Sequence, residues 1–305
     1  MGTKRIWRLL QETFREWNND KASRLAAALA YYTMFSLAPL LVIVIAIAGF
    51  FFDQADVQSQ LTQQIQGLVG EEGAAFAQTA LDNANTPGEN TSLIASIISV
   101  VLLLIGATGV FGQLQESLNV VWNVEAKPGN AAKGFVKKRL LSFAMLLTIG
   151  FLLMVSLVLS TVLSALSAYL SGLLPGADAL WQLLDFSLSV ALVTVMFALL
   201  FKYVPDVEII WSDVWTGAFI TALLFTIGKF FLGAYLGNSG FSSTYGAAGS
   251  VIIILAWVYY SAQILFFGAE FTQVYARRYG SRIRPDKHAV AVSPKRPAQR
   301  DMSWR

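Results

Sequence analysis

Residues 216–237, "TGAFITALLFTIGKFFLGAYLG", are apolar almost throughout, and Lys229 is the one charged residue among them. A helix needs about 20 apolar residues to cross the roughly 30 Å of hydrocarbon in a bilayer. The stretch therefore predicts a transmembrane helix. Because an unpaired charge at mid-depth costs about 2.5–3.5 kcal/mol, we expect Lys229 to face protein or water instead of lipid.

The whole chain shares this apolar character. Of its 305 residues, 55% are hydrophobic and only 13% are charged, whereas about 25% are charged in a typical soluble domain. The chain contains no cysteine, which excludes disulfides and thiolate metal sites. Since a helix satisfies its own backbone hydrogen bonds in lipid, we predict six transmembrane helices, near residues 30–52, 93–113, 141–164, 181–201, 214–236 and 247–271.

Lysine and arginine occur on alternate connections between these spans. None lies in 53–92, 165–180 or 237–246, whereas the other connections and both ends carry nearly all of them. The positive-inside rule then places both termini in the cytoplasm. The predicted protein is all-α and polytopic, with three parts: a cytoplasmic amphipathic helix at 1–28, a six-helix transmembrane domain at 29–276 with an outer loop at 53–92, and a basic disordered cytoplasmic tail at 277–305.

The segments outside the membrane have patterns of their own. Near the N-terminus one helical face is apolar, which predicts a helix lying in the inner interface; its residues are Ile6, Leu10, Phe14 and Trp17. The outer loop has apolar residues at helical spacing and is expected to form short helices. The tail is rich in proline and basic residues, which favours disorder and contact with anionic lipid.

Polar residues in the outer half of the membrane accompany Lys229. On its own helix Lys229 lies on a face of small residues that includes Ala218 and Ala222, and such faces pack against other helices in membranes. Two interpretations stay open: a hydrophilic outer vestibule with an Asp185–Lys229 pair, or close helix packing around one buried salt bridge. The other candidates for either are Ser156, Ser160, Ser164 and Ser167 in the third span and Gln182 and Ser189 in the fourth.

A second set of polar residues lies toward the inner rim. Glu116 follows the second span, and Gln263 and Glu270 share one face of the sixth. Ion pairs with the basic cluster at 137–139 are one interpretation, and a gate or proton site is the other. Three acids near the fifth span could bind a cation, although a solvated turn explains them as well: Asp206, Glu208 and Asp213.

Four segments make the chain resemble the YihY/virulence factor BrkB family of bacterial inner-membrane proteins, over roughly residues 15–276. They are "LAAALAYYTMFSLAPLL" at 25–41, "GVFGQLQESLNVVWNV" at 109–124, "FKYVPDVEIIWSDVWTGAFITALLFTIGKFFLGAYLG" at 201–237 and "YGAAGSVIIILAWVYYSAQILFFGAEFTQVYA" at 245–276. The resemblance implies a six-helix, multi-pass protein of the bacterial inner membrane. Members of the family have been linked to serum resistance and to handling of lipid-A-type lipids, and some have been labelled tRNA-processing ribonucleases.

The residues argue against the ribonuclease label. Metal-dependent phosphodiester cleavage needs clustered carboxylates or histidines, and the single histidine is His288 in the tail. We therefore expect no enzyme, no cofactor, no metal and no nucleic-acid partner. The expected function is a transporter or flippase-like protein that handles a lipid or amphiphilic solute. The alternative is a non-catalytic envelope scaffold that binds protein partners. Membrane lipids are the expected partners in the first case, and a homo-oligomer is compatible with either.

Overall fold

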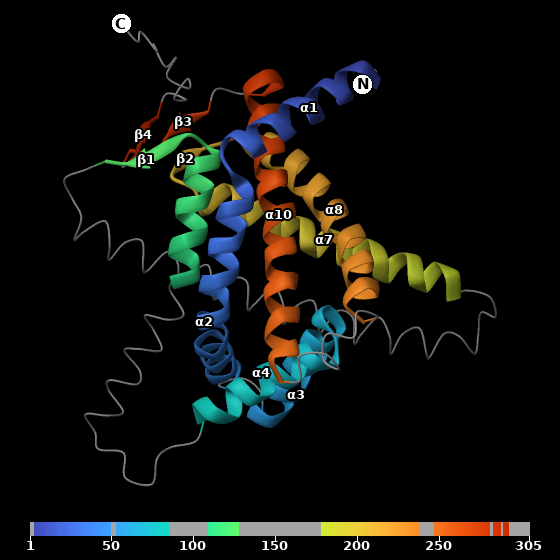
Figure 1. Cartoon of the computed structure of the whole chain (residues 1–305). Coiled ribbons are helices and arrows are strands. Elements are labelled where there is room, and N and C mark those ends of the chain that lie inside the picture. The colour runs from blue at the N-terminus through green and yellow to red at the C-terminus, as the bar shows by residue number, and fades with distance from the viewer. Residues whose placement is uncertain are drawn as a thin grey trace, which may run out of the picture.

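The computed structural model describes residues 3–49, 53–85, 109–127, 178–237, 247–280, 283–287 and 289–292. These residues are mostly helical, and four short strands lie at the end of the bundle that carries α1 (Figure 1). The elements are α1 (Thr3–Asn19), α2 (Ala22–Ala48), α3 (Gln54–Val69), α4 (Glu71–Asn85), β1 (Val124–Ala126), α7 (Asp178–Tyr203), β2 (Val207–Glu208), α8 (Trp211–Gly237), α10 (Ala247–Tyr279), β3 (Arg284–Pro285) and β4 (Ala289–Ala291). Residues 109–121 are also helical.

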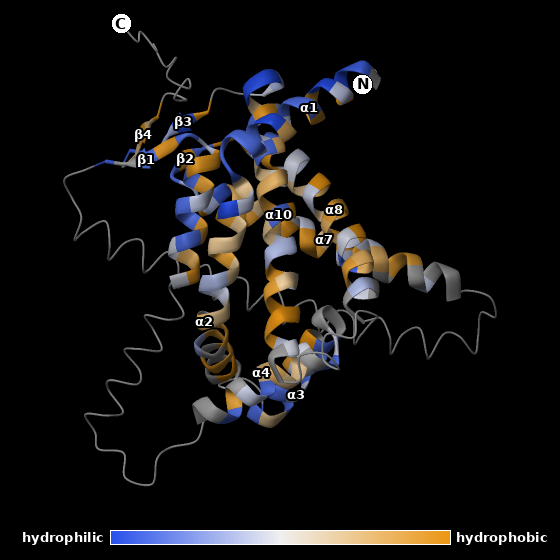
Figure 2. Ribbon diagram, in the orientation of Figure 1, coloured by the Kyte–Doolittle hydropathy of each residue, from blue (hydrophilic) through white to orange (hydrophobic). Residues whose placement is uncertain are grey.

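Three of the described helices are long and apolar enough to cross a membrane. They contain the stretches Phe186–Tyr203, Trp211–Gly233 and Gly249–Tyr279, which match the predicted spans near 181–201, 214–236 and 247–271. Hydrophobic residues predominate along the middle of α10, and hydrophilic ones gather at the end with α1 and the strands (Figure 2). The total of six spans and the orientation of the termini stay predictions, since most of the second span and all of the third lie outside the described residues.

Helices α8 and α10 pack closely where a glycine of each helix faces a threonine of the other. Thr272 of α10 lies over Gly217 of α8, and Thr221 of α8 lies over Gly268 of α10. All four residues are buried. Each threonine hydroxyl donates to the carbonyl oxygen of the glycine four residues earlier in its own helix, at 2.7 Å for Thr221 and 2.6 Å for Thr272. A buried hydroxyl without a hydrogen-bond partner would be costly, and this bond within the helix gives each hydroxyl a partner. Because the two glycines have no Cβ atom, the backbones of α8 and α10 can come close together.

Helix α1 packs along one face of α10 and exposes the opposite face. Leu9 is only 2% exposed and lies against Phe271 and Val274. The guanidinium group of Arg5 stacks 3.8 Å above the ring of Tyr279. Exposed apolar side chains cover the other face, as a helix lying in the membrane interface requires: Ile6, Trp7, Leu10 and Phe14.

The short helices expected in the loop at 53–92 are present as α3 and α4. Asp53 caps the start of α3, because its side chain accepts a hydrogen bond from the backbone N–H of Ala55 at 2.9 Å. Gly70 ends α3 with φ at +86°, a conformation that side chains other than glycine rarely adopt. The pair packs on α2 through a small core of four buried residues: Leu41, Ile45, Ala77 and Leu81.

The expectation of a disordered tail from residue 277 onward is wrong for the described part of that segment. Helix α10 continues to Tyr279, and the chain then forms β3, which pairs antiparallel with β2, and β4, which pairs antiparallel with β1. Ala289 is buried within the main core. The open backbone edges of β1 and β2 supply partners that composition alone does not reveal, and pairing with them outweighs the local preference of a proline-rich, basic sequence.

Candidate functional site

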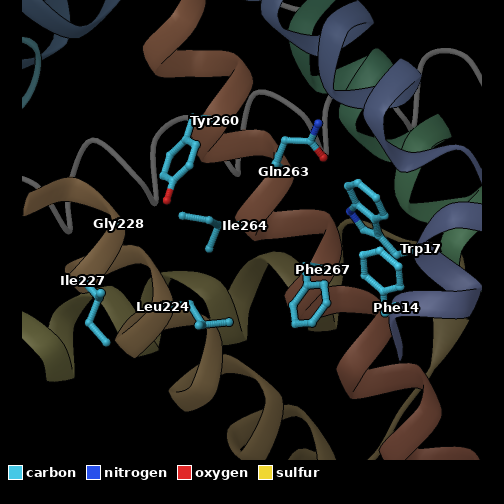
Figure 3. A pocket seen from close by; sticks show the side chains of 9 residues that line it. All are labelled: Phe14, Trp17, Leu224, Ile227, Gly228, Tyr260, Gln263, Ile264 and Phe267. Atoms are coloured by element: carbon cyan, nitrogen blue, oxygen red, sulfur yellow. The ribbon is translucent and has the colours of Figure 1, made fainter. Parts of the chain in front are cut away.

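A cavity of about 350 Å³ lies between α1, α8 and α10. We call it the lateral cavity. Helix α10 lines one wall with residues spaced at i, i+3, i+4 and i+7, and α8 and α1 supply the rest. Figure 3 shows the nine lining residues, which are Phe14 and Trp17 of α1, Leu224, Ile227 and Gly228 of α8, and Tyr260, Gln263, Ile264 and Phe267 of α10.

Two local features shape the lateral cavity. A Cβ atom at Gly228 would lie 2.7 Å from Cδ1 of Ile264 and 2.9 Å from Cε1 of Tyr260, so a larger residue at this position would force these two side chains to shift. At the side of α1, the rings of Phe14 and Trp17 stack with their centroids 5.7 Å apart. Close helix contact thus bounds the cavity on one side, and a stacked aromatic pair bounds it on the other.

The lining is mainly apolar but contains two polar atoms without partners. Nε1 of Trp17 and Oε1 of Gln263 are both buried, and neither has a hydrogen-bond partner among the described residues. Figure 3 shows the Gln263 side chain extending from α10 on the side of the cavity where Trp17 lies. The indole nitrogen donates and the amide oxygen accepts, so the lining contains one donor and one acceptor, both shielded from solvent in this structure.

A pair of carboxyl groups, Asp20 and Glu270, lies beside α1. Glu270 of α10 is fully buried, and no N–H group or hydroxyl of the described residues reaches either of its oxygens. The group that does interact with it is the side chain of Asp20, in the corner between α1 and α2. Two carboxyl groups can be joined by a hydrogen bond only when a proton lies between them. We call these two residues the carboxyl pair.

The surroundings of Asp20 change its acidity. Burial raises the pKa of Asp20 to about 6, from an ordinary value of 3.8. Its hydrogen bond with Glu270 and the charge of Arg277 oppose this rise, whereas the charge of Glu16 adds to it. The Asp20 carboxyl group therefore titrates close to neutral pH.

The structure separates the three residues expected at the inner rim. Glu116 is exposed, Gln263 lines the lateral cavity, and Glu270 belongs to the carboxyl pair. The basic cluster at 137–139 lies outside the described residues. Trp17 and Asp20 were not singled out as site residues, and their signal is faint: a tryptophan at the end of an amphipathic helix and an acid at a helix corner.

The outer set of candidates is not assembled by the described residues. Ala218 and Ala222 are fully buried as expected for a packing face, but the side chains of Lys229 and Ser189 are exposed. The helices that the structure describes do not shield Lys229. Its pairing with Asp185 stays a prediction, because the other candidates lie outside what is described: the side chains of Gln182 and Asp185, and residues Ser156, Ser160, Ser164 and Ser167.

Asp206, one of the three acids near the fifth span, makes a structural contact. The carboxylate of Asp206 accepts hydrogen bonds from the side-chain amides of Gln115 at 3.0 Å and Asn119 at 2.8 Å. Its backbone N–H donates to Oδ1 of Asn119 at 2.8 Å. Glu208 is exposed and Asp213 is buried. Across the described part of the chain, no group of three acids or histidines could hold a metal ion.

Comparisons with known proteins point to one family. A family model described as Virulence factor BrkB matches residues 13–293, which includes the strands that follow α10. A UPF0761 membrane protein of Pseudomonas paraeruginosa is 29% identical over 258 residues, covering 82% of this chain and 58% of the relative. One from Teredinibacter turnerae is 29% identical over 279 residues, covering 90% of this chain and 61% of the relative. One from Tolumonas auensis is 27% identical over 263 residues, covering 85% of this chain and 82% of the relative.

The chain thus spans about three-fifths of the length of the first two relatives. Their names describe membrane proteins and state no activity. No solved structure matches the chain.

Proposed function

Because the chain belongs to the Virulence factor BrkB family and its relatives are membrane proteins, we propose that it handles a lipid or amphiphilic solute in the bacterial inner membrane, as a transporter or flippase-like protein. The observation that carries this proposal is the lateral cavity, whose apolar lining holds one donor and one acceptor that have no partner in the described part of the chain. The site would bind an acyl chain together with a polar group at its end.

The lining favours an amphiphile over other ligands. A purely apolar ligand would leave Nε1 of Trp17 and Oε1 of Gln263 unpaired, which costs about 1–3 kcal/mol for each buried group. A purely polar solute would lose its hydration against the apolar walls. At about 350 Å³ the volume is near the lower end of ligand pockets, roughly 300–1,000 Å³, so it suits one chain or part of a lipid.

The position of the cavity supports entry from the bilayer. Phe14, Ile227 and Tyr260 at its rim are exposed, at 60%, 55% and 38%, so the groove opens sideways. Helix α1 belongs to the interface by its apolar face. A lipid of the inner leaflet could therefore enter between α1 and α8, with its polar group near Trp17 and its chain along α10. The predicted vestibule around Lys229 would receive the polar group on the outer side.

Two substitutions test the proposal. Trp17→Phe removes the donor and Gln263→Leu removes the acceptor, while both keep an apolar side chain in place. The full chain is purified into lipid nanodiscs and washed with detergent, and the retained phospholipid is quantified by mass spectrometry. Since a hydrogen bond in a buried site contributes about 1 kcal/mol, we expect each variant to retain about fivefold less lipid.

The matched control is Trp7→Phe, because Trp7 lies on the same helix, is 63% exposed and does not line the cavity. It should retain lipid like the natural chain. Equal retention in all three variants would refute lipid binding at this site. Cross-linking in cells separates the scaffold alternative: a stoichiometric protein partner that is unaffected by Trp17→Phe and Gln263→Leu would favour the scaffold.

A further inference from the structure

Helix α1 carries a row of exposed basic side chains. Its members are Lys4, Arg8 and Arg15, and the side chain of Arg15 is 71% exposed. Because an α-helix turns by about 100° per residue, these three residues fall within about 40° of one another around the helix axis. We call them the basic stripe. Gln11, which is also exposed, lies beside the stripe between Arg8 and Arg15.

The two glutamates of α1 are engaged elsewhere. Arg277 of α10 lies 3.2 Å from a carboxylate oxygen of Glu12 and 3.3 Å from one of Glu16. Arg278 of α10 lies 3.0 Å from the other carboxylate oxygen of Glu12. The acids of α1 are therefore turned toward the basic end of α10, and their charge is balanced there.

The basic stripe keeps its positive charge for this reason. Arg15 lies 3.8 Å from Glu16, and so exposed an ion pair contributes little. Lys4 and Arg8 form no ion pair with any described residue. The stripe thus presents three cationic groups that await an anionic partner from outside the described part of the chain.

The exposed apolar face of α1 adjoins the basic stripe. Trp7 is 63% exposed and Phe14 is 60% exposed, and Trp7 lies only about 60° around the helix from Lys4. Leu9, on the far side of the apolar face, is buried against α10. A helix that exposes an apolar face next to basic side chains binds a membrane surface, where attraction to anionic lipid adds to the burial of apolar area.

We propose that the basic stripe binds the phosphate groups of anionic phospholipids in the inner leaflet, while the apolar face beside it enters the acyl region. In the predicted orientation α1 lies on the cytoplasmic side, where the leaflet is negatively charged. The charge of the stripe selects anionic headgroups, and the exposed apolar side chains select a bilayer over an acidic protein. This inference goes beyond the proposed function, because no residue of the stripe lines the lateral cavity.

Two properties distinguish this surface from a purely apolar anchor. Each basic residue near an anionic membrane contributes about fivefold to binding. The attraction is screened beyond about 10 Å in 0.1 M salt and beyond about 3 Å in 1 M salt. A preference for anionic lipid should therefore fall with each stripe residue that is removed and with added salt, whereas insertion of the apolar face should respond to neither.

The absence of cysteine allows the lipid beside the stripe to be measured directly. Gln11→Cys places a single thiol there for a fluorophore, in the full chain in phosphatidylcholine nanodiscs. Nitroxide-labelled phosphatidylglycerol or nitroxide-labelled phosphatidylcholine is added in equal amount as a quencher, and the ratio of the two quenching efficiencies gives the lipid preference. The test variants are Arg8→Gln and the triple variant Lys4→Gln, Arg8→Gln, Arg15→Gln. The controls are Arg8→Lys, which keeps the charge, and Lys287→Gln, which removes an exposed charge outside α1.

We expect the natural stripe to favour phosphatidylglycerol in about 0.1 M salt, with a preference about fivefold lower in Arg8→Gln. The preference should be lost in the triple variant and in about 1 M salt, and both controls should keep it. Salt titration needs no substitution in the stripe, so it decides even if the triple variant fails to fold.

Equal quenching by the two lipids beside the natural stripe would overturn the proposal and assign the stripe to an acidic protein partner. An unchanged preference in the triple variant would overturn it as well. Neither result depends on lipid retention in Trp17→Phe and Gln263→Leu, so the basic stripe and the lateral cavity can fail independently.

Discussion

The substitution Gly217→Ala tests the packing that holds the lateral cavity in shape. The new Cβ atom would overlap the side chain of Thr272, lying 2.6 Å from its Cβ and 2.9 Å from its Cγ2. Because Cβ of Thr272 is fixed directly to the backbone of α10, the overlap is relieved only if α8 and α10 move apart. Overpacking of this kind costs about 1–3 kcal/mol, and the higher helix propensity of alanine returns at most about 1 kcal/mol.

We therefore expect Gly217→Ala to lower the free energy of unfolding by about 2 kcal/mol, or the apparent Tm by about 5 °C. Thermal unfolding of the purified chain in detergent, followed by tryptophan fluorescence, measures the change. The matched control is Gly233→Ala in the same helix, where nothing lies within 4 Å of the new Cβ atom. The control should unfold at the natural temperature or slightly above it.

The double variant Gly217→Ala with Thr272→Gly makes the test specific. It removes the three atoms that the new Cβ would meet, so it should recover part of the lost stability relative to Gly217→Ala. Full additivity of the two single substitutions would mean that the residues do not contact each other. Equal stability of Gly217→Ala and Gly233→Ala would refute the close approach of α8 and α10 itself.

Three further predictions concern the end of the bundle with α1. Asp20→Asn should stabilise the protein more at about pH 8 than at about pH 4. The pKa of Asp20 is raised to about 6 in the folded chain, so the natural chain loses stability as the pH rises from about 4 through 6, and the substitution should recover about 1–2 kcal/mol after allowance for its partial exposure. Chemical unfolding at both pH values checks this, and an equal effect at both would contradict it. Leu9→Ala should cost about 2–4 kcal/mol and loosen α1, seen as faster proteolysis near residue 20, whereas Leu10→Ala, at an exposed site, should not. Asn119→Ala leaves the carboxylate and backbone N–H of Asp206 short of partners and should cost about 2–3 kcal/mol, measured by thermal unfolding; a variant as stable as the natural chain would show that water replaces both bonds.

Hydrophobic runs and helical periodicity predicted what depends on local sequence. Such patterns predicted the spans that contain Lys229 and Glu270, because a membrane helix needs a long apolar sequence. They also predicted the apolar face around Phe14, because an amphipathic helix shows its apolar residues at helical spacing. The shared face of Gln263 and Glu270 was also visible in the sequence. The sequence did not show which residues lie against that face, since Trp17 and Asp20 belong to a segment far away in the chain.

Contacts that join distant segments required the structure. The two helices share one spacing of glycine and threonine, as "GAFIT" at 217–221 and "GAEFT" at 268–272. Only their antiparallel packing shows that the glycine of each segment faces the threonine of the other. The strands after α10 escaped prediction because strands of two or three residues are stable only with a partner. Composition indicated a disordered tail, and tertiary pairing overrode that preference.

The contacts of α1 have a consequence for how the protein is made. Glu12 and Arg277 are 265 residues apart in the chain, and the ribosome needs on the order of 10–50 s to synthesise that length. During this interval the side of α1 that carries Leu9 is not covered by α10. Final assembly at this end therefore waits for α10, and the insertion machinery and membrane proteases encounter a bundle whose α1–α2 corner closes only after α10 has entered the bilayer.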